Sequence, residues 1–299
     1  LRNGHDARVI DYAFLKSGYV KIPVPVPSLS DLIKDYKPDI IGISVFSYLY
    51  DEVNEMVAEV GRLTNAVLIL GGPHFAVFPE DFTENPNVDY IVKGEAELYI
   101  ADIVRKAKKN SRAEIIVCER PSATDIPPLN INIAYGNTFL TDYQIQLSRG
   151  CPFHCGFCNI HMVGGRQVRK RSLEECMAEI LEAKLLHPSI GNISITDDCP
   201  NADKGRFKDF LRMFIKADTG CTMLVDNMRA DLIDDEMLEL FVKARGLNVC
   251  MGVESGNPDV LKTMNKSETI DDIIKAAEMI RKHKLMLGNC FVIGLPGDT

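Results

Sequence analysis

Short apolar runs and helically spaced apolar residues alternate along the first third of the chain. Residues 39–45 form an apolar run that is typical of a strand covered on both faces of a parallel sheet. Apolar residues then recur at helical spacing over 50–63, and further strands are expected at 66–70 and 89–92. A glycine-containing turn follows each of these strands, and the second turn is expected to open another helix. This alternation predicts an α/β domain with a doubly wound parallel sheet.

The second half of the chain repeats this alternation after a segment without periodicity. Residues 119–142 contain a stretch rich in proline and turn formers, and we interpret them as a linker between domains at 1–118 and 143–299. The Ser172–Glu175 segment is typical of a capping box that opens a helix. Five successive parallel strand–helix steps predict a partial or complete barrel that holds ligands at the carboxyl ends of its strands. The expected strands are 143–147, 192–196, 222–226, 247–253 and 287–293, and the expected later helices are 203–217, 234–244 and 270–283.

Composition and charge narrow the class of protein. At 299 residues and 46% hydrophobic content, the chain can bury two moderate cores. Its 34 basic and 42 acidic residues give a formal charge of −8, so nucleic acid is an unlikely partner. No apolar run approaches the length of about eighteen residues that a membrane helix needs, so no membrane span is expected. Nine irregularly spaced cysteines indicate a reducing, cytoplasmic location rather than disulfides.

Both ends of the sequence read as cut. The chain starts at Leu1, and residues 4–11 read as the end of a helix that runs directly into a strand. Residues 291–299 read as a strand and a turn with no element after them. We therefore expect a fragment in which the first domain is incomplete at its N-terminus and the second is truncated after its fifth strand.

Three closely spaced cysteines, Cys151, Cys155 and Cys158, lie between an expected strand and an expected helix. Gaps of three and two residues let one tight loop aim three sulfurs at a [4Fe-4S] cluster, and the fourth iron is then left without a local protein ligand. The alternative is a zinc site completed by His154 or His161, although no second cysteine pair follows at the usual interval.

The cysteine spacing, with the aromatic Phe157 just before the last cysteine, resembles the motif of the radical S-adenosylmethionine (SAM) superfamily. The resemblance implies that Cys151, Cys155 and Cys158 are the metal ligands of a [4Fe-4S] cluster. It implies that SAM binds to the open iron and is cleaved reductively to a 5′-deoxyadenosyl radical. It also implies a partial (βα)6 TIM-like barrel, a small-molecule or natural-product substrate, and an electron donor such as flavodoxin or ferredoxin.

Polar residues follow the second and third strands of the expected barrel. Asp197 and Asp198 stand where superfamily members touch the amino group of SAM, although aspartate also suits a turn or a helix cap. Arg229 suits a bidentate pair with the SAM carboxylate, and a surface arginine is the alternative. Cys199 lies beside the aspartates, at the expected barrel mouth.

Three further segments resemble SAM contacts of the superfamily. Glu254 and Ser255 resemble the segment that reaches the ribose or amino group, and a bound polar ligand would explain a carboxylate beside apolar residues. The turn at Ile293 and Gly294 resembles the one that meets adenine, and Phe157 accompanies the cysteines as a SAM neighbour.

Turns after the first-domain strands resemble those of the cobalamin (B12)-binding domain that precedes many radical SAM barrels. The resemblance spans about residues 1 to 110. Glycines at strand ends permit close approach of the backbone to a large planar ligand, and Ser44 suits a nucleotide tail in a Rossmann-like crevice. We interpret His74 as a turn residue rather than a cobalt ligand, because no supporting partner is evident. The expected cobalamin contacts are Ser44, Gly71, Gly72, Pro73, His74, Gly94 and Glu95.

The resemblance implies a cobalamin-dependent radical SAM methyltransferase that methylates carbon or phosphorus. A cobalamin-dependent radical SAM cyclase or rearrangement enzyme is one alternative. A methylthiotransferase is another, but it uses three more cysteines ahead of the barrel, and this chain has none before Cys118. The non-enzymatic alternative is a zinc or electron-transfer module, which would leave Asp198 and Glu254 without a function. The basic run at 166–171 is expected to pair with acidic residues of the next helix rather than with RNA.

Overall fold

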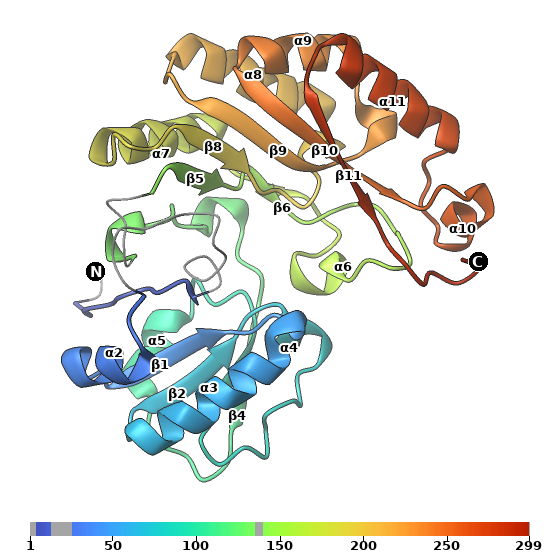
Figure 1. The fold of residues 1–299 in the computed structure, drawn as a ribbon. Helices are drawn as coiled ribbons and strands as arrows, with labels where there is room; N and C mark the ends of the chain where they lie inside the picture. Colours follow the sequence, from blue (N-terminus) through green and yellow to red (C-terminus); the bar gives the residue numbers. More distant parts are fainter. Residues whose placement is uncertain (1–3, 13–25, 135–139, 299) are drawn as a thin grey trace. The chain divides into compact units, whose positions relative to one another are not determined.

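The computed structural model in Figure 1 divides into two compact units. The structure describes residues 4–12, 26–134 and 140–298, so residues 135–139 of the predicted linker lie outside the described residues. One unit comprises residues 1–127 with 133–136, and the other comprises 128–132 with 137–299. No helix of the described segments has the length and apolar character needed to cross a membrane.

The first unit is built on a four-stranded parallel sheet whose strands lie in sequence order, β1-β2-β3-β4. Leu68 and Leu70 of β2 pack in one apolar cluster, whereas Val67 and Ile69 of the same strand pack in another. The sheet is therefore covered on both faces, as the apolar runs predicted. The strands are β1 (Ile40–Ser44), β2 (Val67–Gly71), β3 (Tyr90–Gly94) and β4 (Glu114–Cys118), and the α-helices are α2 (Leu29–Tyr36), α3 (Tyr50–Leu63), α4 (His74–Val77) and α5 (Ile100–Lys106).

Three details of the first unit differ from the sequence prediction. The strand β4 was not predicted, and it pairs in register with β3 at the end of the sheet. Helix α5 begins at Ile100 rather than in the turn after β3, because Gly94, with φ +103°, ends the strand and a longer turn follows. Residues 4–11 form no strand, and only an isolated bridge joins Val9 to Ala134.

The second unit is built on a five-stranded, fully parallel sheet in the order β11-β10-β9-β8-β5. This sequential order confirms the predicted series of strand–helix steps. The sheet strands are β5 (Asp142–Ile145), β8 (Asn192–Ile195), β9 (Thr222–Met228), β10 (Gly246–Glu254) and β11 (Met286–Phe291). The helices are α6 (Ile160–Val163), α7 (Leu173–Leu186), α8 (Lys204–Ala217), α9 (Asp235–Lys243), α10 (Pro258–Thr263) and α11 (Ile270–Lys282), and a short ladder joins β6 (Ser148–Arg149) to β7 (Arg169–Lys170).

Helices α7, α8, α9 and α11 cover one face of this sheet (Figure 1). In β10, Val249, Met251 and Val253 are buried in that core, and they alternate with Cys250 and Gly252, which are only partly buried. Because successive side chains of a strand point to opposite faces, this second set faces away from the helices. We call this side the inner face.

Capping residues set the starts of the helices. Ser172 accepts a hydrogen bond from the Glu175 N–H at the start of α7, and Thr269 forms a complete capping box with Asp272 at the start of α11. The prediction for the basic run is confirmed for Arg171, which pairs with the buried Glu179 of α7, whereas Lys170 Nζ lies 2.6 Å from Asp203 Oδ2 at the N-cap of α8.

Candidate functional site

The cysteine loop, residues 150–168, leaves the sheet beyond the end of β5 and is closed by the β6–β7 ladder. Gly150 has φ +97°, and a side chain there would collide with the Gln167 carbonyl oxygen. Only glycine therefore fits at the loop entry. The Cys151 N–H donates to the Gly165 carbonyl (3.0 Å), which closes the base of the loop. This ladder and this turn hold all three cysteines at the carboxyl end of the sheet.

The segment 264–268, between α10 and α11, holds the cysteine loop from a distant part of the sequence. The Gly156 N–H donates to the Met264 carbonyl (2.6 Å), and Asn265 Nδ2 donates to the His154 carbonyl (3.0 Å). Sequence reasoning did not identify this segment. A polar stretch between two helices carries no periodic signal, so only its contacts reveal its role.

Charged groups of both signs lie near the three thiols. Cys151, Cys155 and Cys158 are all partly buried. Burial raises the pKa of Cys155, whereas the nearby cations Lys266 and Arg229 lower it. The pKa of Cys151 falls to about 7, chiefly because Cys199 donates a hydrogen bond to its sulfur. Burial raises the pKa of Cys158 as well, so among the three only Cys151 has a lowered pKa, which favours the thiolate that binds metal.

The donor set fits a [4Fe-4S] cluster. Three thiols on one loop, with cations beside them, match the ligands and the negative charge of such a cluster. Within the described part of the chain, no three His, Cys, Asp or Glu side chains are grouped to hold a single metal ion. Ligands of a cluster each bind a different iron, so they need not converge on one point.

The aspartates after β8 hold the start of the cysteine loop. Asp197 is 1% exposed, and its carboxylate accepts hydrogen bonds from the Leu147 N–H (2.6 Å) and the Ser148 hydroxyl (2.5 Å). Burial raises the pKa of Asp197 to about 7. Asp198 accepts from the Gly150 N–H (2.6 Å). Both oxygens of Asp197 thus hold the segment that leads into the cysteine loop, which indicates a positioning role.

The Arg229 side chain also has partners within the protein. Its guanidinium makes two hydrogen bonds to Asp231 (3.0 and 3.1 Å) and stacks on the ring of Phe153, 3.7 Å from the ring centre. It is 6% exposed. Its predicted pair with a ligand carboxylate stays a prediction, since the guanidinium pairs with Asp231 in this structure. The stacking on Phe153 ties β9 to the cysteine loop.

A chain of buried charges joins Arg229 to Glu254. Glu268 accepts from the Ala230 N–H (2.6 Å), and its carboxylate lies 3.7 Å from Arg229 and 2.8 Å from Lys266. Lys266 Nζ then lies 3.6 Å from Glu254 Oε1. Burial raises the pKa of Glu254, and Lys266 lowers it. Neither Lys266 nor Glu268 was a predicted site residue.

Strained backbone marks the ends of β9 and β10. Asn227 has φ +59° and Glu254 has φ +66°, and the register with β11 shifts between Gly252 and Glu254. Non-glycine residues in this region cost free energy, and such strain is concentrated at functional sites. Ser255, next to Glu254, is 7% exposed.

The remaining predicted SAM contacts lie in loops. Ile293 is 97% exposed, and Gly294, with φ +86°, donates its N–H to Asp298 (3.1 Å) in the turn after β11. Phe157 is partly buried in the cysteine loop. The structure thus brings Asp197, Asp198, Arg229 and Glu254 together around the cysteine loop, through direct contacts or the 264–268 segment, and leaves Ile293 exposed.

In the first unit, glycines are required where two turns approach other backbone. Gly72 has φ +105°, and a side chain there would lie 2.7 Å from the Val45 nitrogen. Gly94 has φ +103°, and a side chain there would collide with the Cys118 carbonyl oxygen. Ser44 is exposed at the end of β1, Gly71 and Pro73 flank Gly72, and Glu95 follows Gly94.

His74 is oriented by two polar partners. Its Nδ1 lies 3.0 Å from Ser47 Oγ and its Nε2 lies 3.0 Å from Asp81 Oδ2, and the side chain is 3% exposed. Both ring nitrogens are therefore engaged within the unit. This agrees with the interpretation of His74 as a structural residue, although His74 begins α4 and the sequence did not indicate its partners.

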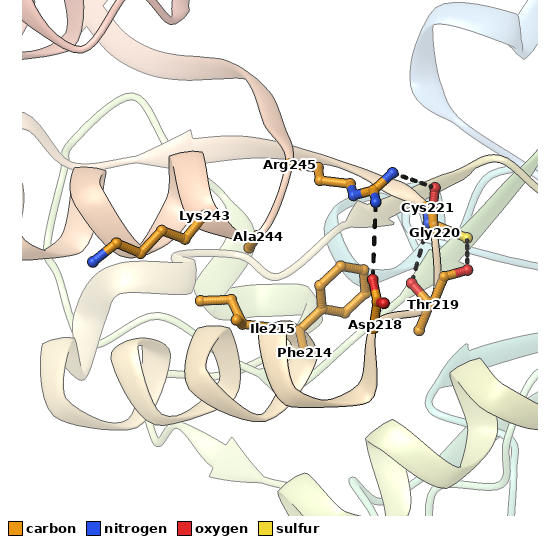
Figure 2. A pocket seen from close by; sticks show the side chains of 9 residues that line it. All are labelled: Phe214, Ile215, Asp218, Thr219, Gly220, Cys221, Lys243, Ala244 and Arg245. Atoms are coloured by element: carbon orange, nitrogen blue, oxygen red, sulfur yellow. Dashed lines mark hydrogen bonds and ion pairs between the residues drawn. The ribbon is translucent and has the colours of Figure 1, made fainter.

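A hollow at the opposite end of the second sheet is remote from this chemistry. Figure 2 shows its lining residues, which lie at the amino-terminal ends of β9 and β10. Arg245 reaches across it to Asp218 (3.8 Å) and to the Gly220 carbonyl (3.5 Å). In parallel α/β folds ligands bind at the carboxyl ends of strands, so this hollow is not a candidate active site.

Comparison with known proteins agrees with the geometry of both units. Residues 145–299 match the radical SAM superfamily, and residues 1–104 match the B12 binding domain. An uncharacterized methyltransferase of Pyrococcus horikoshii is 26% identical, over all of this chain and 68% of its own length. The anaerobic magnesium-protoporphyrin IX monomethyl ester cyclase of Rubrivivax gelatinosus is 25% identical, over 89% of this chain and 53% of its own length. The chain therefore spans about half to two thirds of these relatives.

A solved structure shares the fold. The radical S-adenosylmethionine methyltransferase TsrM from Kitasatospora setae superposes with a TM-score of 0.71 and 18% identity, over 90% of this chain and 60% of TsrM. The family matches confirm the resemblance inferred from the cysteine motif and from the glycine turns. This chain belongs to the radical SAM superfamily, as a cobalamin-binding member with a B12 binding domain ahead of its radical SAM domain.

Proposed function

We propose that this chain is the cofactor-binding part of a cobalamin-dependent radical SAM methyltransferase that acts on a small molecule in the cytoplasm. The observation that carries the proposal is the cysteine loop, with three thiols at the carboxyl end of a parallel sheet and cations beside them. The preceding B12 binding domain supports cobalamin as the second cofactor.

Cys151, Cys155 and Cys158 would each bind one iron. A [4Fe-4S] cluster at this loop supplies the electron that cleaves SAM to methionine and a 5′-deoxyadenosyl radical. Arg229 and Lys266 offset the negative charge of the thiolates, and the hydrogen bond from Cys199 favours the thiolate of Cys151. A flavodoxin or ferredoxin is the proposed electron donor.

The strained end of β10 is the proposed contact for the polar groups of SAM. Glu254, held by Lys266, suits the amino group, and Ser255 suits the ribose. The turn at Ile293 and Gly294 is the proposed adenine contact, with Phe157 on the cysteine side. Asp197, Asp198 and Arg229 act as positioning residues for the loop.

The carboxyl end of the first sheet is the proposed cobalamin site. Cobalamin bound there supplies the methyl group for transfer. Gly72 and Gly94 keep the backbone at the strand ends free of side chains, and the exposed Ser44 suits the nucleotide tail. Gly71, Pro73 and Glu95 line the same turns. Because both nitrogens of His74 are engaged, we propose that this imidazole does not ligate cobalt.

A cobalamin-dependent cyclase is the second candidate, because the Rubrivivax gelatinosus relative carries that name. The two reactions differ in their products from SAM. A methyltransferase consumes one SAM as a methyl source and so releases S-adenosylhomocysteine, whereas a cyclase needs only the radical.

The test uses the full-length protein, reconstituted without oxygen with iron, sulfide and hydroxocobalamin and then desalted. About four iron and one cobalt per chain are expected. With SAM and a low-potential reductant, both 5′-deoxyadenosine and S-adenosylhomocysteine should form. 5′-Deoxyadenosine without S-adenosylhomocysteine would favour the cyclase. Zinc binding with no uptake of iron would contradict the proposal, and the Cys158→Ala variant controls for adventitious iron.

A further inference from the structure

Two thiols touch on the inner face of the second sheet. Cys250 Sγ and Cys290 Sγ are 3.7 Å apart, within hydrogen-bonding distance for sulfur, on the neighbouring parallel strands β10 and β11. Cys250 is partly buried and Cys290 is exposed, whereas the other cysteines outside the cysteine loop are all buried. No part of the proposed function uses this pair.

The thiol pair lies beside the proposed SAM contacts. Cys290 is the register partner of Gly252, and a side chain on Gly252 would collide with the Glu254 carboxylate. The Glu254 side chain therefore folds back along the strand toward the cysteines. The charges of Asp226 and Glu254 both raise the pKa of Cys250, so the two carboxylates lie near this thiol.

The geometry favours two thiols over a disulfide. Cys250 is paired with Gly288 and Cys290 with Gly252, so the two cysteines are diagonal rather than direct neighbours. Neighbouring strands lie about 4.8 Å apart and rise about 3.3 Å per residue, so residues two positions out of register have Cα atoms roughly 8 Å apart. A disulfide usually needs about 4.4–6.8 Å between its Cα atoms. Burial and the hydrogen bond to Cys290 raise the pKa of Cys250 to about 11, so that its S–H is kept at neutral pH.

We propose that the Cys250–Cys290 pair donates a hydrogen atom to a carbon radical formed on the inner face. The proposal rests on the proposed function, because cleavage of SAM provides the radical. A thiol suits this step because its S–H bond is weaker than the O–H and N–H bonds of other side chains. The pair would end an unproductive radical before it abstracts hydrogen from the protein.

The proposed step transfers one hydrogen atom from sulfur to carbon. One S–H bond of the pair breaks homolytically and one C–H bond forms, which leaves a thiyl radical on sulfur. The neighbouring thiol can pass its own hydrogen atom across the 3.7 Å contact, which moves the thiyl radical to the exposed Cys290. One electron from the low-potential reductant and one proton from water then restore the thiol.

The experiment follows deuterium into 5′-deoxyadenosine. The full-length reconstituted protein is incubated with SAM and dithionite in D2O, without substrate and without added thiol. Thiols exchange their proton with D2O and carbon-bound hydrogens do not. Wild type should give 5′-deoxyadenosine one mass unit heavier, and the double variant Cys250→Ser/Cys290→Ser should lose this shift, because serine keeps the packing but not the weak S–H bond.

Cys221→Ser is the matched control. Cys221 is buried at the start of β9, and its sulfur donates to the Ile190 carbonyl (3.5 Å), a bond that serine can keep. This variant should retain the mass shift. Equal iron content and equal circular dichroism in all three proteins show that the fold and the cluster are intact.

Alkylation of the protein before cluster loading gives a readout independent of catalysis. Iodoacetamide should modify Cys290 first and then Cys250, while Cys221 stays unmodified until the protein unfolds. An unreactive Cys290 overturns the inference. Unlabelled 5′-deoxyadenosine from wild type, or labelled product from the double variant, overturns the inference and leaves the proposed function standing. Absence of any 5′-deoxyadenosine overturns both.

Discussion

Replacing Glu268 by glutamine tests the buried charge chain beneath the cysteine loop. The Glu268 side chain has 0% exposure, lies 2.8 Å from Lys266 and 3.7 Å from Arg229, and accepts a hydrogen bond from the Ala230 N–H. Glutamine keeps the shape and can still accept from Ala230. It removes the negative charge that lies between two cations, which are themselves only 5% and 7% exposed in their side chains.

The size of the loss in stability depends on the ion pairs that Arg229 and Lys266 keep after the substitution. Arg229 keeps Asp231 at 3.0 Å, whereas Lys266 keeps the more distant Glu254 at 3.6 Å. Removing one partner of a buried ion pair typically costs about 3–5 kcal/mol. For a domain of this size, about 1 kcal/mol shifts the unfolding temperature by roughly 2–4 °C, so we expect a decrease of roughly 6–20 °C. The 264–268 segment should also loosen its hold on the cysteine loop.

Thermal unfolding of the reduced protein, followed by circular dichroism before cluster loading, measures this effect. Glu236→Gln is the matched control, because Glu236 forms exposed ion pairs with Lys208 and Arg212 (2.7 and 2.6 Å). Such pairs contribute about 0–1 kcal/mol. If Glu268→Gln and Glu236→Gln lower the unfolding temperature equally, the charge chain does not stabilise the site as argued.

Three further substitutions test other parts of the structure. Asp197→Asn can still accept from the Leu147 N–H, and its amide N–H can donate to the Ser148 oxygen in place of the bond that Asp197 accepts. Because burial raises the pKa of Asp197 to about 7, the wild type loses stability as pH rises from about 4 to 7, and the advantage of the variant in urea unfolding should grow by up to about 1.4 kcal/mol per pH unit. Gly72→Ala should destabilise the first unit by about 1–3 kcal/mol and weaken the uptake of hydroxocobalamin, because Gly72 has φ +105° and the new side chain would meet the Val45 nitrogen. Gly42→Ala is the control and should have neither effect, because the space beside Gly42 is open. Cys155→Ala should lose most of the roughly four irons on reconstitution, and Cys118→Ala should keep them.

Each of these has a clear contrary result. A stability difference between Asp197→Asn and wild type that is the same at every pH means that Asp197 is not a buried acid with a raised pKa. Equal cobalt uptake by Gly72→Ala and Gly42→Ala removes Gly72 from the cobalamin site. Full iron content in Cys155→Ala means that other ligands hold the cluster.

The sequence by itself predicted most helices and strands and the cofactor class of the protein. Apolar periodicity located α3, α8 and β9 to within a few residues, because long periodic segments bury one consistent face. The spacing of Cys151, Cys155 and Cys158 predicted the cluster ligands that we propose, since three thiolates so close in sequence can reach one centre. Glycine turns at strand ends indicated the cobalamin domain for a similar local reason.

Tertiary structure alone decided which polar residues pair with one another inside the protein. From the sequence, Asp197 and Arg229 looked like SAM contacts, yet their oxygens and nitrogens are taken by Leu147, Ser148 and Asp231. Lys266 and Glu268 lie more than a hundred residues after the cysteines, and the thiols of Cys250 and Cys290 meet across 40 residues. Long-range contacts of this kind depend on strand order and register, which no local pattern encodes, and buried polar groups take whichever partners that packing supplies.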